Sequence, residues 1–375
     1  MPKLLYLATE DWAFCQHFIP MARAAKSDGF HVVVAARGSA ARDRITSEGF
    51  RFVPLDNERG SFGPRTILRS IAQMAAVVRA EQPDIVHCVS LRVVLLGGIA
   101  ARLARANKVV LAVTGLGHLW VQDGPVERLA RPITRFAVGR WLRRPGTYYL
   151  FENPDDPREF NLDLADPRVV IVDGAGVDPI AFAPSPEPVA PPIKVAVIAR
   201  MLKPKGIAEA VAATQLARSR GAPVELHLFG TPDPGNRTSY TEADLRRWSE
   251  LSGVFWHGQT TDPAAVYRDH HIAMLLSHRE GLPKTLVEAA AIGRPIVTTD
   301  VAGCREVARD GIEGFCVPRG DVEATAMALA RLAGDAGLRA RMGKAARERF
   351  EERFTEERVQ AAIAKLYRNL MAPSR

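Results

Sequence analysis

Residues 278–294 read His-Arg-Glu-Gly-Leu-Pro-Lys-Thr-Leu-Val-Glu-Ala-Ala-Ala-Ile-Gly-Arg and are the most informative stretch of the chain. The apolar run before them, residues 271–277, is typical of a buried strand, and the Ala-rich segment after Pro283 is typical of a helix. The residues from Glu280 to Thr285 are therefore expected to form a strand-to-helix turn. Pro283 can occupy the first helical position, where its missing N–H costs little.

This turn has the features of an anion site. The amides just after Pro283 have no acceptor within the helix, and the helix dipole favours a negative charge beside them. Two acids flank the turn, with Glu280 at its start and Glu288 about one helical turn further on. A phosphate with a carboxylate on each side matches a ligand with a diphosphate and hydroxyl-rich ends, such as a nucleotide sugar. Alternatively, the two acids bind no ligand and only complement the helix dipole, an interpretation that fits the spacing equally well.

Length and composition limit the classes of protein. A chain of 375 residues predicts two domains, and 47% apolar with 25% charged residues is typical of a soluble globular protein. The four cysteines are far apart and indicate neither a disulfide framework nor a zinc knuckle, which favours a cytoplasmic location without a signal peptide. No apolar run approaches the roughly 20 residues of a membrane span.

The net charge of +8 implies anionic partners. Nucleic acid is not expected, because there is no zinc finger, RNP-like aromatic strand or aromatic–basic interleaving. Phosphorylated small molecules and an anionic membrane surface remain. The segment 128–144 can lie on an anionic membrane surface or hold a lipid diphosphate, because its six arginines are interleaved with apolar residues and no acid. A basic helix packed on the core would have the same pattern.

Short apolar runs alternate with longer helical patterns, which indicates parallel sheets wrapped by helices. In the first half, strands are predicted at residues 3–8, 31–36, 50–55, 84–89, 108–113, 148–151 and 169–172, and helices at 14–27, 65–81 and 93–107. In the second half, strands are predicted at 193–199, 224–229, 253–256, 272–277 and 295–299, and residues 324–370 are predicted to be helical. The fold class is therefore α/β, with two doubly wound, Rossmann-like domains.

A proline-rich stretch separates the two halves. Five prolines lie within residues 183–192, a density that neither a helix nor a central strand tolerates. We predict domains at residues 1–182 and 193–354, joined by this stretch as a linker. Ligands of doubly wound sheets bind beyond the carboxyl ends of the strands, so the active site is expected in a central cleft between the domains.

A basic loop follows the first strand of the second half. The sequence Arg200-Met-Leu-Lys-Pro-Lys205-Gly206 places cations at the carboxyl edge of the predicted sheet. Arginine offers a planar fork to a diphosphate, and lysine offers a point charge. A solvated basic loop is the alternative. Two candidate anion sites on neighbouring loops favour one shared ligand.

These residues resemble a known family. Arg200…Lys205-Gly206, followed by Glu280-Gly-Leu-Pro-Lys-Thr-Leu-Val-Glu288, is similar to the retaining GT-B glycosyltransferases of family 4 (glycosyl transferases group 1) and their E-x7-E signature. The resemblance covers most of residues 193–350, including the stretches 293–299 and 311–314. In the first half it is looser, and the segments 115–118, 153–156 and 174–178 are similar to polyprenyl-linked glycan assembly enzymes.

The resemblance implies roles for individual residues. Arg200 and Lys205 would clamp the donor diphosphate, Glu280 would hold hydroxyls of the donor sugar, and Glu288 would hold the ribose. The other donor-binding residues would be Gly281, Leu282, Pro283, Lys284, Thr285 and Leu286, with the amides of residues 284–286 meeting the distal phosphate. A helix at about residues 355–371 would pack back on the first domain.

Candidates from the first half are fewer. The resemblance makes His118, after the strand 108–113, a catalytic candidate that would contact the donor sugar; a structural histidine in a turn is the alternative. Glu10 and Asp11 would lie near the acceptor. No metal site or cofactor is predicted, because His270 and His271 are adjacent in a chain entering a strand and no Asp-x-Asp is suitably placed. Arginine, lysine and a helix N-terminus can replace the ion.

The predicted function is that of a retaining, metal-independent hexosyltransferase. It would move a hexose or N-acetylhexosamine from a UDP-linked donor to a polyprenyl-linked saccharide in the biosynthesis of a surface polysaccharide such as lipopolysaccharide. The enzyme would be peripheral on the inner face of the cytoplasmic membrane. Two alternatives remain: a nucleotide-sugar epimerase on the same fold, and a non-catalytic nucleotide-sugar-binding subunit of a membrane assembly complex.

Overall fold

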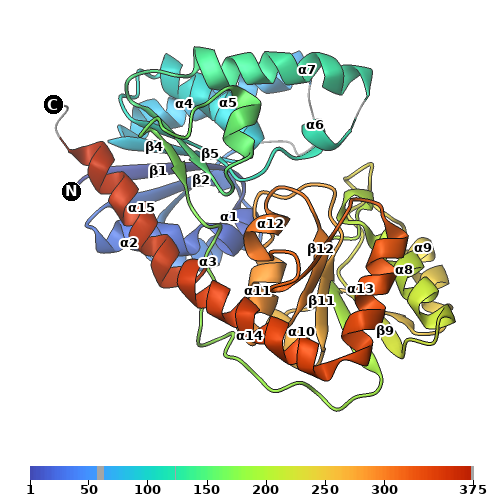
Figure 1. Ribbon diagram of the computed structural model, residues 1–375. Helices are drawn as coiled ribbons and strands as arrows, with labels where there is room; N and C mark the ends of the chain where they lie inside the picture. The colour runs from blue at the N-terminus through green and yellow to red at the C-terminus, as the bar shows by residue number, and fades with distance from the viewer. Residues whose placement is uncertain (57–62, 123, 373–375) are drawn as a thin grey trace. The chain divides into compact units, whose positions relative to one another are not determined.

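A computed structural model describes residues 1–56, 63–122 and 124–372 of the chain (Figure 1). The chain divides into two compact units: unit 1 comprises Met1–Gly176 with Glu356–Arg375, and unit 2 comprises Val177–Thr355. Each unit is built on one parallel sheet with hydrophobic clusters on both faces. The prediction of two doubly wound α/β domains is therefore confirmed.

Unit 1 contains a seven-stranded sheet in the order β3-β2-β1-β4-β5-β6-β7. Its strands are β1 (Lys3–Glu10), β2 (His31–Arg37), β3 (Arg51–Pro54), β4 (Ile85–Val89), β5 (Val109–Val113), β6 (Thr147–Phe151) and β7 (Val169–Ile171). All seven lie where the alternating pattern predicts them. The inner strands are apolar at consecutive positions because helices cover both faces of the sheet.

Alternate residues of β1 contribute to two separate hydrophobic clusters. Leu4 and Tyr6 pack with α1, α2 and α15 on one face, and Leu5 and Leu7 pack with α4 and α5 on the other (Figure 1). The helices of unit 1 are α1 (Asp11–His17), α2 (Ile19–Ser27), α3 (Arg42–Ser47), α4 (Pro64–Glu81), α5 (Leu91–Leu103), α6 (His118–Val121), α7 (Pro125–Phe136) and α15 (Glu356–Met371). A π-helical turn, η1 (Ala137–Trp141), follows α7, and a 3₁₀ turn, η2 (Asp156–Phe160), follows β6.

The prediction of a single helix over residues 14–27 is wrong. The segment forms two helices, α1 and α2, which meet at Phe18. Pro20 is the physical reason, because it lacks the N–H that would bond to Gln16 and its ring would clash with the preceding turn. Pro20 instead lies in the first turn of α2, where proline is tolerated.

The last helix, α15, is part of unit 1. Tyr367 Oη lies 2.6 Å from Tyr6 Oη and 2.7 Å from His87 Nδ1, and all three side chains are buried. The apolar side chains of α15 that are buried in the cluster around Leu4 are Val359, Ile363, Leu366 and Leu370. The first strand and the last helix of the chain thus share one core.

Unit 2 contains a six-stranded parallel sheet in the order β10-β9-β8-β11-β12-β13. Its strands are β8 (Ile193–Ile198), β9 (Val224–Phe229), β10 (Val254–Trp256), β11 (Ile272–Leu275), β12 (Ile296–Thr299) and β13 (Gly314–Val317). Its helices are α8 (Ile207–Ser219), α9 (Glu242–Ser249), α10 (Pro263–Arg268), α11 (Lys284–Ile292), α12 (Cys304–Val307), α13 (Val322–Gly334) and α14 (Ala336–Arg353), with a 3₁₀ turn η3 (Lys203–Lys205).

The sequence-based prediction missed β13. This strand is only four residues long and begins with a glycine, so its apolar run is too short to stand out. Glycine is required there, because a Cβ on Gly314 would lie 1.8 Å from the carbonyl oxygen of Ile296 on β12. The missing side chain of Gly314 allows the two strands to approach, and it also weakens the strand pattern in the sequence.

The predicted boundary at residue 182 and the linker at 183–192 require correction. The chain passes from unit 1 to unit 2 between Gly176 and Val177, and the proline-rich stretch belongs to unit 2. The buried guanidinium of Arg294 holds it, donating to Ser185 O (2.9 Å), Ser185 Oγ (2.8 Å) and Pro186 O (2.8 Å). The density of prolines correctly indicates an irregular chain. It does not indicate that a distant arginine binds the carbonyls of this stretch and holds it to unit 2.

We expect Arg294→Lys to lower the free energy of unfolding by about 2–4 kcal/mol. The guanidinium also donates to the carbonyls of Tyr267 (2.8 Å) and Arg268 (3.2 Å), and a single ammonium cannot reach all of these acceptors. Urea unfolding followed by circular dichroism measures the loss. Arg246→Lys, exposed on α9, is the matched control and should change stability by less than about 0.5 kcal/mol. Equal stability of the two variants would contradict the role given to Arg294.

Candidate active site

The predicted strand-to-helix turn is present after β11, at the carboxyl edge of the unit 2 sheet. Helix α11 begins at Lys284, so Pro283 is its cap rather than its first residue. The carbonyl of Pro283 accepts from the amides of Leu286 (3.0 Å) and Val287 (3.2 Å). Of the amides predicted to meet a phosphate, that of Leu286 is therefore bonded within the helix. Those of Lys284 and Thr285 occupy the first two helical positions, where backbone amides point out of a helix end.

The centre of the site is an ion pair between Lys205 and Glu280. Lys205 Nζ contacts Glu280 Oε1, and Ser277 Oγ donates to the same oxygen at 2.5 Å. Both charged side chains are about four-fifths buried or more. The structure thus brings together two of the predicted catalytic residues that lie 75 positions apart in the chain.

Three contacts bring their two loops together. Glycine is required at position 206 for two reasons. Its backbone has φ +69°, a left-handed conformation, and a Cβ there would lie 2.1 Å from the carbonyl oxygen of Leu276. The amide of His278 donates to Pro204 O at 2.9 Å. His278 Nε2 also lies 3.0 Å from Glu209 Oε1 on α8, and this hydrogen bond lowers the pKa of the Glu209 carboxyl.

Strand β12 and the loop after it support the same turn. Thr298 Oγ1 donates to Leu275 O at 2.7 Å, and Thr299 Oγ1 donates to Ser277 O. Gly303 has φ +77°, and a Cβ there would lie 2.3 Å from Gly281 O. Sequence reasoning missed these supports, as it missed Ser277. The paired threonines at the end of a predicted strand and the glycine after them were the available signals.

Arg200 lies at the end of β8 but is not part of the Lys205–Glu280 contact. Its Nη1 lies 3.3 Å from Asp233 Oδ2, and half of its side chain is exposed. Asp233 was not predicted as a site residue. Both predicted cations therefore have carboxylate partners, and a phosphate that binds them competes with Asp233 and Glu280.

Glu288 is buried on the first turns of α11. Burial raises the pKa of its carboxyl to about 7, while the neighbouring Lys284 ammonium, 3.9 Å away, acts in the opposite direction. A carboxyl that is half ionised near neutrality can accept hydrogen bonds from hydroxyl groups, as the predicted contact with a ribose requires. The other predicted donor-binding residues form the connection into α11 and its first turn: Gly281, Leu282, Pro283, Lys284, Thr285 and Leu286.

The three candidate site residues of unit 1 lie in different surroundings. His118 begins α6, after the carboxyl end of β5, but its side chain lies outside the part of the structure that is described. Asp11 is fully buried and holds the loop after β2: its carboxylate accepts from Ser39 Oγ (2.6 Å) and from the amides of Ser39 (2.5 Å) and Trp12 (2.7 Å). Glu10 is also buried, with Arg37 Nη1 at 3.6 Å. Asp11 thus has a structural role.

The described residues contain no group of three or more His, Cys, Asp or Glu side chains arranged to hold a metal ion. None of the described helices is long and apolar enough to cross a bilayer.

Two family models match the chain, one in each unit. The family model for "Glycosyl transferases group 1" matches residues 192–335, which include the Lys205–Glu280 pair and all of α11. The model for "Glycosyl transferase 4-like" matches residues 3–141 of unit 1. The chain is a glycosyltransferase with a group 1 domain in unit 2 and a 4-like domain in unit 1. The resemblance read from the motifs is therefore confirmed.

Individual relatives agree with this assignment. The glycosyltransferase is similar to the capsular polysaccharide biosynthesis glycosyltransferase CapM of Staphylococcus aureus. The two are 28% identical over 177 aligned residues, which make up 47% of this chain and 46% of CapM. It is 21% identical to the N,N'-diacetylbacillosaminyl-diphospho-undecaprenol alpha-1,3-N-acetylgalactosaminyltransferase of Campylobacter jejuni, over 94% of this chain and 96% of that one. Its fold matches Anabaena HepE, solved with UDP-glucose, at a TM-score of 0.77, with 16% identity over 98% of this chain and all of HepE.

We expect the stability of the glycosyltransferase to depend on the ionisation of Glu288. The raised pKa means that the folded protein binds this proton more tightly than the unfolded chain, whose pKa is about 4.5. The carboxyl therefore costs no stability below about pH 4.5, and its cost grows as the pH rises toward 7. Glu288→Gln removes this cost.

Urea unfolding at several pH values tests the expectation. The stability of Glu288→Gln relative to the wild type should increase between about pH 4.5 and 7 and then level off, reaching a few kcal/mol at most. A stability difference that stays constant from pH 4.5 to pH 8 would show that Glu288 does not titrate in this range.

Proposed function

We propose that this glycosyltransferase moves a sugar from a UDP-linked donor to a lipid-linked saccharide acceptor, with retention of the anomeric configuration, in the synthesis of a polysaccharide. The Lys205–Glu280 pair beside the start of α11 is the observation that carries the proposal. It brings a cation from the loop after β8 into contact with a carboxylate that lies just before the N-terminus of α11. These are the groups that a nucleotide diphosphate joined to a sugar would engage.

Each group has a separate task in the proposed reaction. Lys205 and Arg200 offset the negative charge that develops on the departing diphosphate, and the amides at the start of α11 add to this effect. Glu280 accepts hydrogen bonds from sugar hydroxyls, and Ser277 fixes the orientation of its carboxylate. Glu288 accepts hydrogen bonds from the ribose hydroxyls. Fixed protein cations supply the charge that a divalent ion would otherwise provide, so the proposed transfer is independent of metal.

Retention follows from the proposed geometry of attack. The bond between the anomeric carbon and the diphosphate oxygen breaks as the acceptor oxygen approaches on the same face of the sugar. The departing oxygen takes the proton of the acceptor hydroxyl, so no protein nucleophile is required. The protein lowers the barrier by holding the diphosphate in the orientation that makes this proton transfer short.

The relatives support the choice of donor and acceptor. HepE was solved with UDP-glucose, and the Campylobacter enzyme is named for a diphospho-undecaprenol acceptor. Both cover more than nine-tenths of this chain, so the likeness is not confined to one unit. We therefore propose a UDP-sugar donor, and an acceptor that carries a polyprenyl diphosphate at a membrane surface.

An exposed stripe on α7 supports the membrane part of the proposal. Four large apolar side chains on one helical face are mostly exposed: Val126 (72%), Leu129 (69%), Ile133 (61%) and Phe136 (62%). Within the described residues, no carboxylate pairs with Arg128 or Arg140, whereas Arg135 pairs with Glu159. A helix that offers apolar side chains and unneutralised arginines suits the interface of an anionic bilayer.

The donor site is tested by titrating UDP into the protein in the presence of a chelator. Lys205→Ala should weaken binding by roughly tenfold or more, because it removes a charge-assisted contact to phosphate. Lys203→Ala, an exposed lysine of the same turn, is the matched control and should bind like the wild type. Glu280→Gln should retain UDP but lose about 100-fold in sugar transfer. A strict need for a divalent ion, or no UDP binding, would overturn the cation model.

Product analysis separates the rival functions. A transferase releases UDP only in step with acceptor glycosylation, whereas an epimerase changes the donor sugar without an acceptor. A non-catalytic binding subunit would support polysaccharide assembly in cells equally well with Glu280→Gln.

The membrane contact is tested by co-sedimentation with vesicles. The double substitution Ile133→Ser/Phe136→Ser should reduce binding to phosphatidylglycerol vesicles by tenfold or more, since it removes most of two exposed apolar side chains. Met327→Ser, an exposed apolar residue on α13 of unit 2, is the control and should bind like the wild type. A wild-type protein that does not sediment with these vesicles would exclude α7 as a membrane contact.

A further inference from the structure

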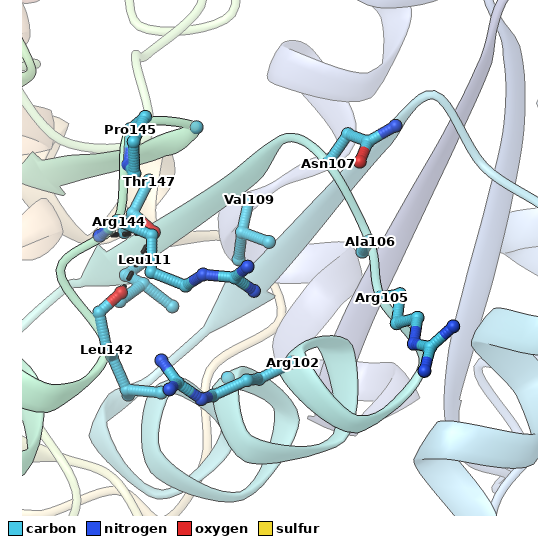
Figure 2. Close-up of a pocket in the computed structure, with 12 residues that line it drawn as sticks. Arg102, Arg105, Ala106, Asn107, Val109, Leu111, Leu142, Arg144, Pro145 and Thr147 are labelled. Atoms are coloured by element: carbon cyan, nitrogen blue, oxygen red, sulfur yellow. Dashed lines mark hydrogen bonds between the residues drawn. The ribbon is translucent and has the colours of Figure 1, made fainter.

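Unit 1 contains a pocket of about 420 Å³ that the proposed reaction does not use (Figure 2). The end of α5 and the segment before β6 form its walls. Three arginines line it, Arg102 and Arg105 from the first wall and Arg144 from the second. Val109, Leu111 and Leu142 provide apolar lining between them.

The pocket lies at the amino ends of β5 and β6, because Asn107 and Thr147 line it and these residues precede and begin those strands. The loop that contains the predicted catalytic histidine follows the opposite, carboxyl end of β5. Five strand residues separate the two ends, a distance of about 15 Å. A ligand in this pocket would therefore not contact residues at the carboxyl edge of its own sheet.

The three arginines have no carboxylate partner among the residues that the structure describes. Arg102 is positioned by neutral groups: its Nη1 donates to Trp141 O at 3.1 Å, and its guanidinium lies 4.6 Å from the centre of the Trp141 ring. The neighbouring acid Asp166 is engaged by Arg143 and Arg168, each at 2.7 Å. Uncompensated guanidinium groups around one cavity favour an anionic occupant.

The backbone of Arg105 gives a second, independent observation. Arg105 follows the end of α5 with φ +60°, a left-handed conformation that glycine or asparagine adopts at far lower cost. Cations at a helix C-terminus also complement the helix dipole, which would account for Arg102. The dipole accounts neither for the left-handed arginine nor for Arg144, which comes from another segment. A costly backbone conformation at a charged residue that lines a pocket supports a function for that side chain.

The pocket is closely framed by the backbone. A Cβ on Gly146 would lie 1.8 Å from Asn107 O, and the amide of Val109 donates to Gly146 O at 2.9 Å. On the other wall, a Cβ on Gly98 would lie 2.8 Å from Leu142 Cδ1. The two segments that contribute the arginines are thus locked together at a fixed spacing.

We propose that this pocket is a second anion site, which binds a phosphate or diphosphate group through Arg102, Arg105 and Arg144. Three planar forks suit the several oxygens of such a group, and the apolar lining suits the organic part attached to it. A soluble phosphate ester and the head group of a phospholipid offer this same chemistry. Because the site is distant from the carboxyl edge of its sheet, its ligand acts as an anchor or a regulator.

The test uses inorganic pyrophosphate as the soluble probe and phosphatidylglycerol vesicles as the lipid probe. Calorimetric titrations are made in a Lys205→Ala background, so that the proposed donor site contributes little. Arg105→Gly and Arg144→Gln should each weaken pyrophosphate binding by roughly tenfold, whereas Arg246→Gln, an exposed arginine on α9 of unit 2, should not. Loss of vesicle binding in the two pocket variants, without any pyrophosphate binding in the parent, identifies the ligand as a lipid head group.

Arg105→Gly separates a binding role from a structural one. Glycine relieves the left-handed strain, so this variant should unfold at the same temperature as the parent or higher while it binds the anion less tightly. If Arg105→Gly unfolds at a lower temperature than the parent, the strain argument fails. The pyrophosphate affinity of Arg144→Gln then decides whether the pocket binds an anion. Equal binding of both probes by the parent and the two pocket variants overturns the proposal, and so does an equal loss in Arg246→Gln.

Discussion

The contact between Lys205 and Glu280 is the constraint on which the candidate active site depends. The two residues come from loops that follow β8 and β11, which are neighbours in the unit 2 sheet although a long stretch of chain separates them. Gly206 allows the backbone of one loop to pass against Leu276 of the other. Ser277 then fixes the carboxylate, and β12 fixes Ser277 through Thr299. Each element of this arrangement holds the next one, so the site is rigid before any substrate arrives.

The pairing of both cations with carboxylates affects how the site selects a ligand. Lys205 pairs with Glu280, and Arg200 pairs with Asp233. A phosphate that binds these cations weakens both ion pairs, so its own contacts must be stronger than those it replaces. A diphosphate, with several charges and many oxygens, can do this better than a singly charged anion. In unit 1 the situation is reversed: the arginines of the pocket at the amino ends of β5 and β6 have no acidic partner among the described residues. The two sites therefore differ in how strongly they attract a simple anion.

Much of the fold was predictable because parallel strands covered on both faces are continuous apolar runs. The inner strands of unit 1 follow this rule, and in unit 2 only β13, short and starting with Gly314, was not predicted. The errors have local physical causes. Pro20 divides a helix that periodicity alone would continue, and Arg294 fastens to unit 2 a proline-rich stretch that composition marks as a linker. In the site, the charged residues were predictable from their motif, but Ser277 and Asp233 were not, because serine and aspartate are common in every loop.

The sequence by itself determined the two doubly wound domains, the turn between β11 and α11, and the identity of the charged residues around it. These follow from hydrophobic periodicity and from motif spacing, which are properties of neighbouring residues. Only the tertiary structure decided which charges meet, which arginine is structural and which carboxyl is buried enough to titrate near neutrality. Those outcomes depend on contacts between residues far apart in the chain and on the exclusion of water, and neither is encoded in any local pattern.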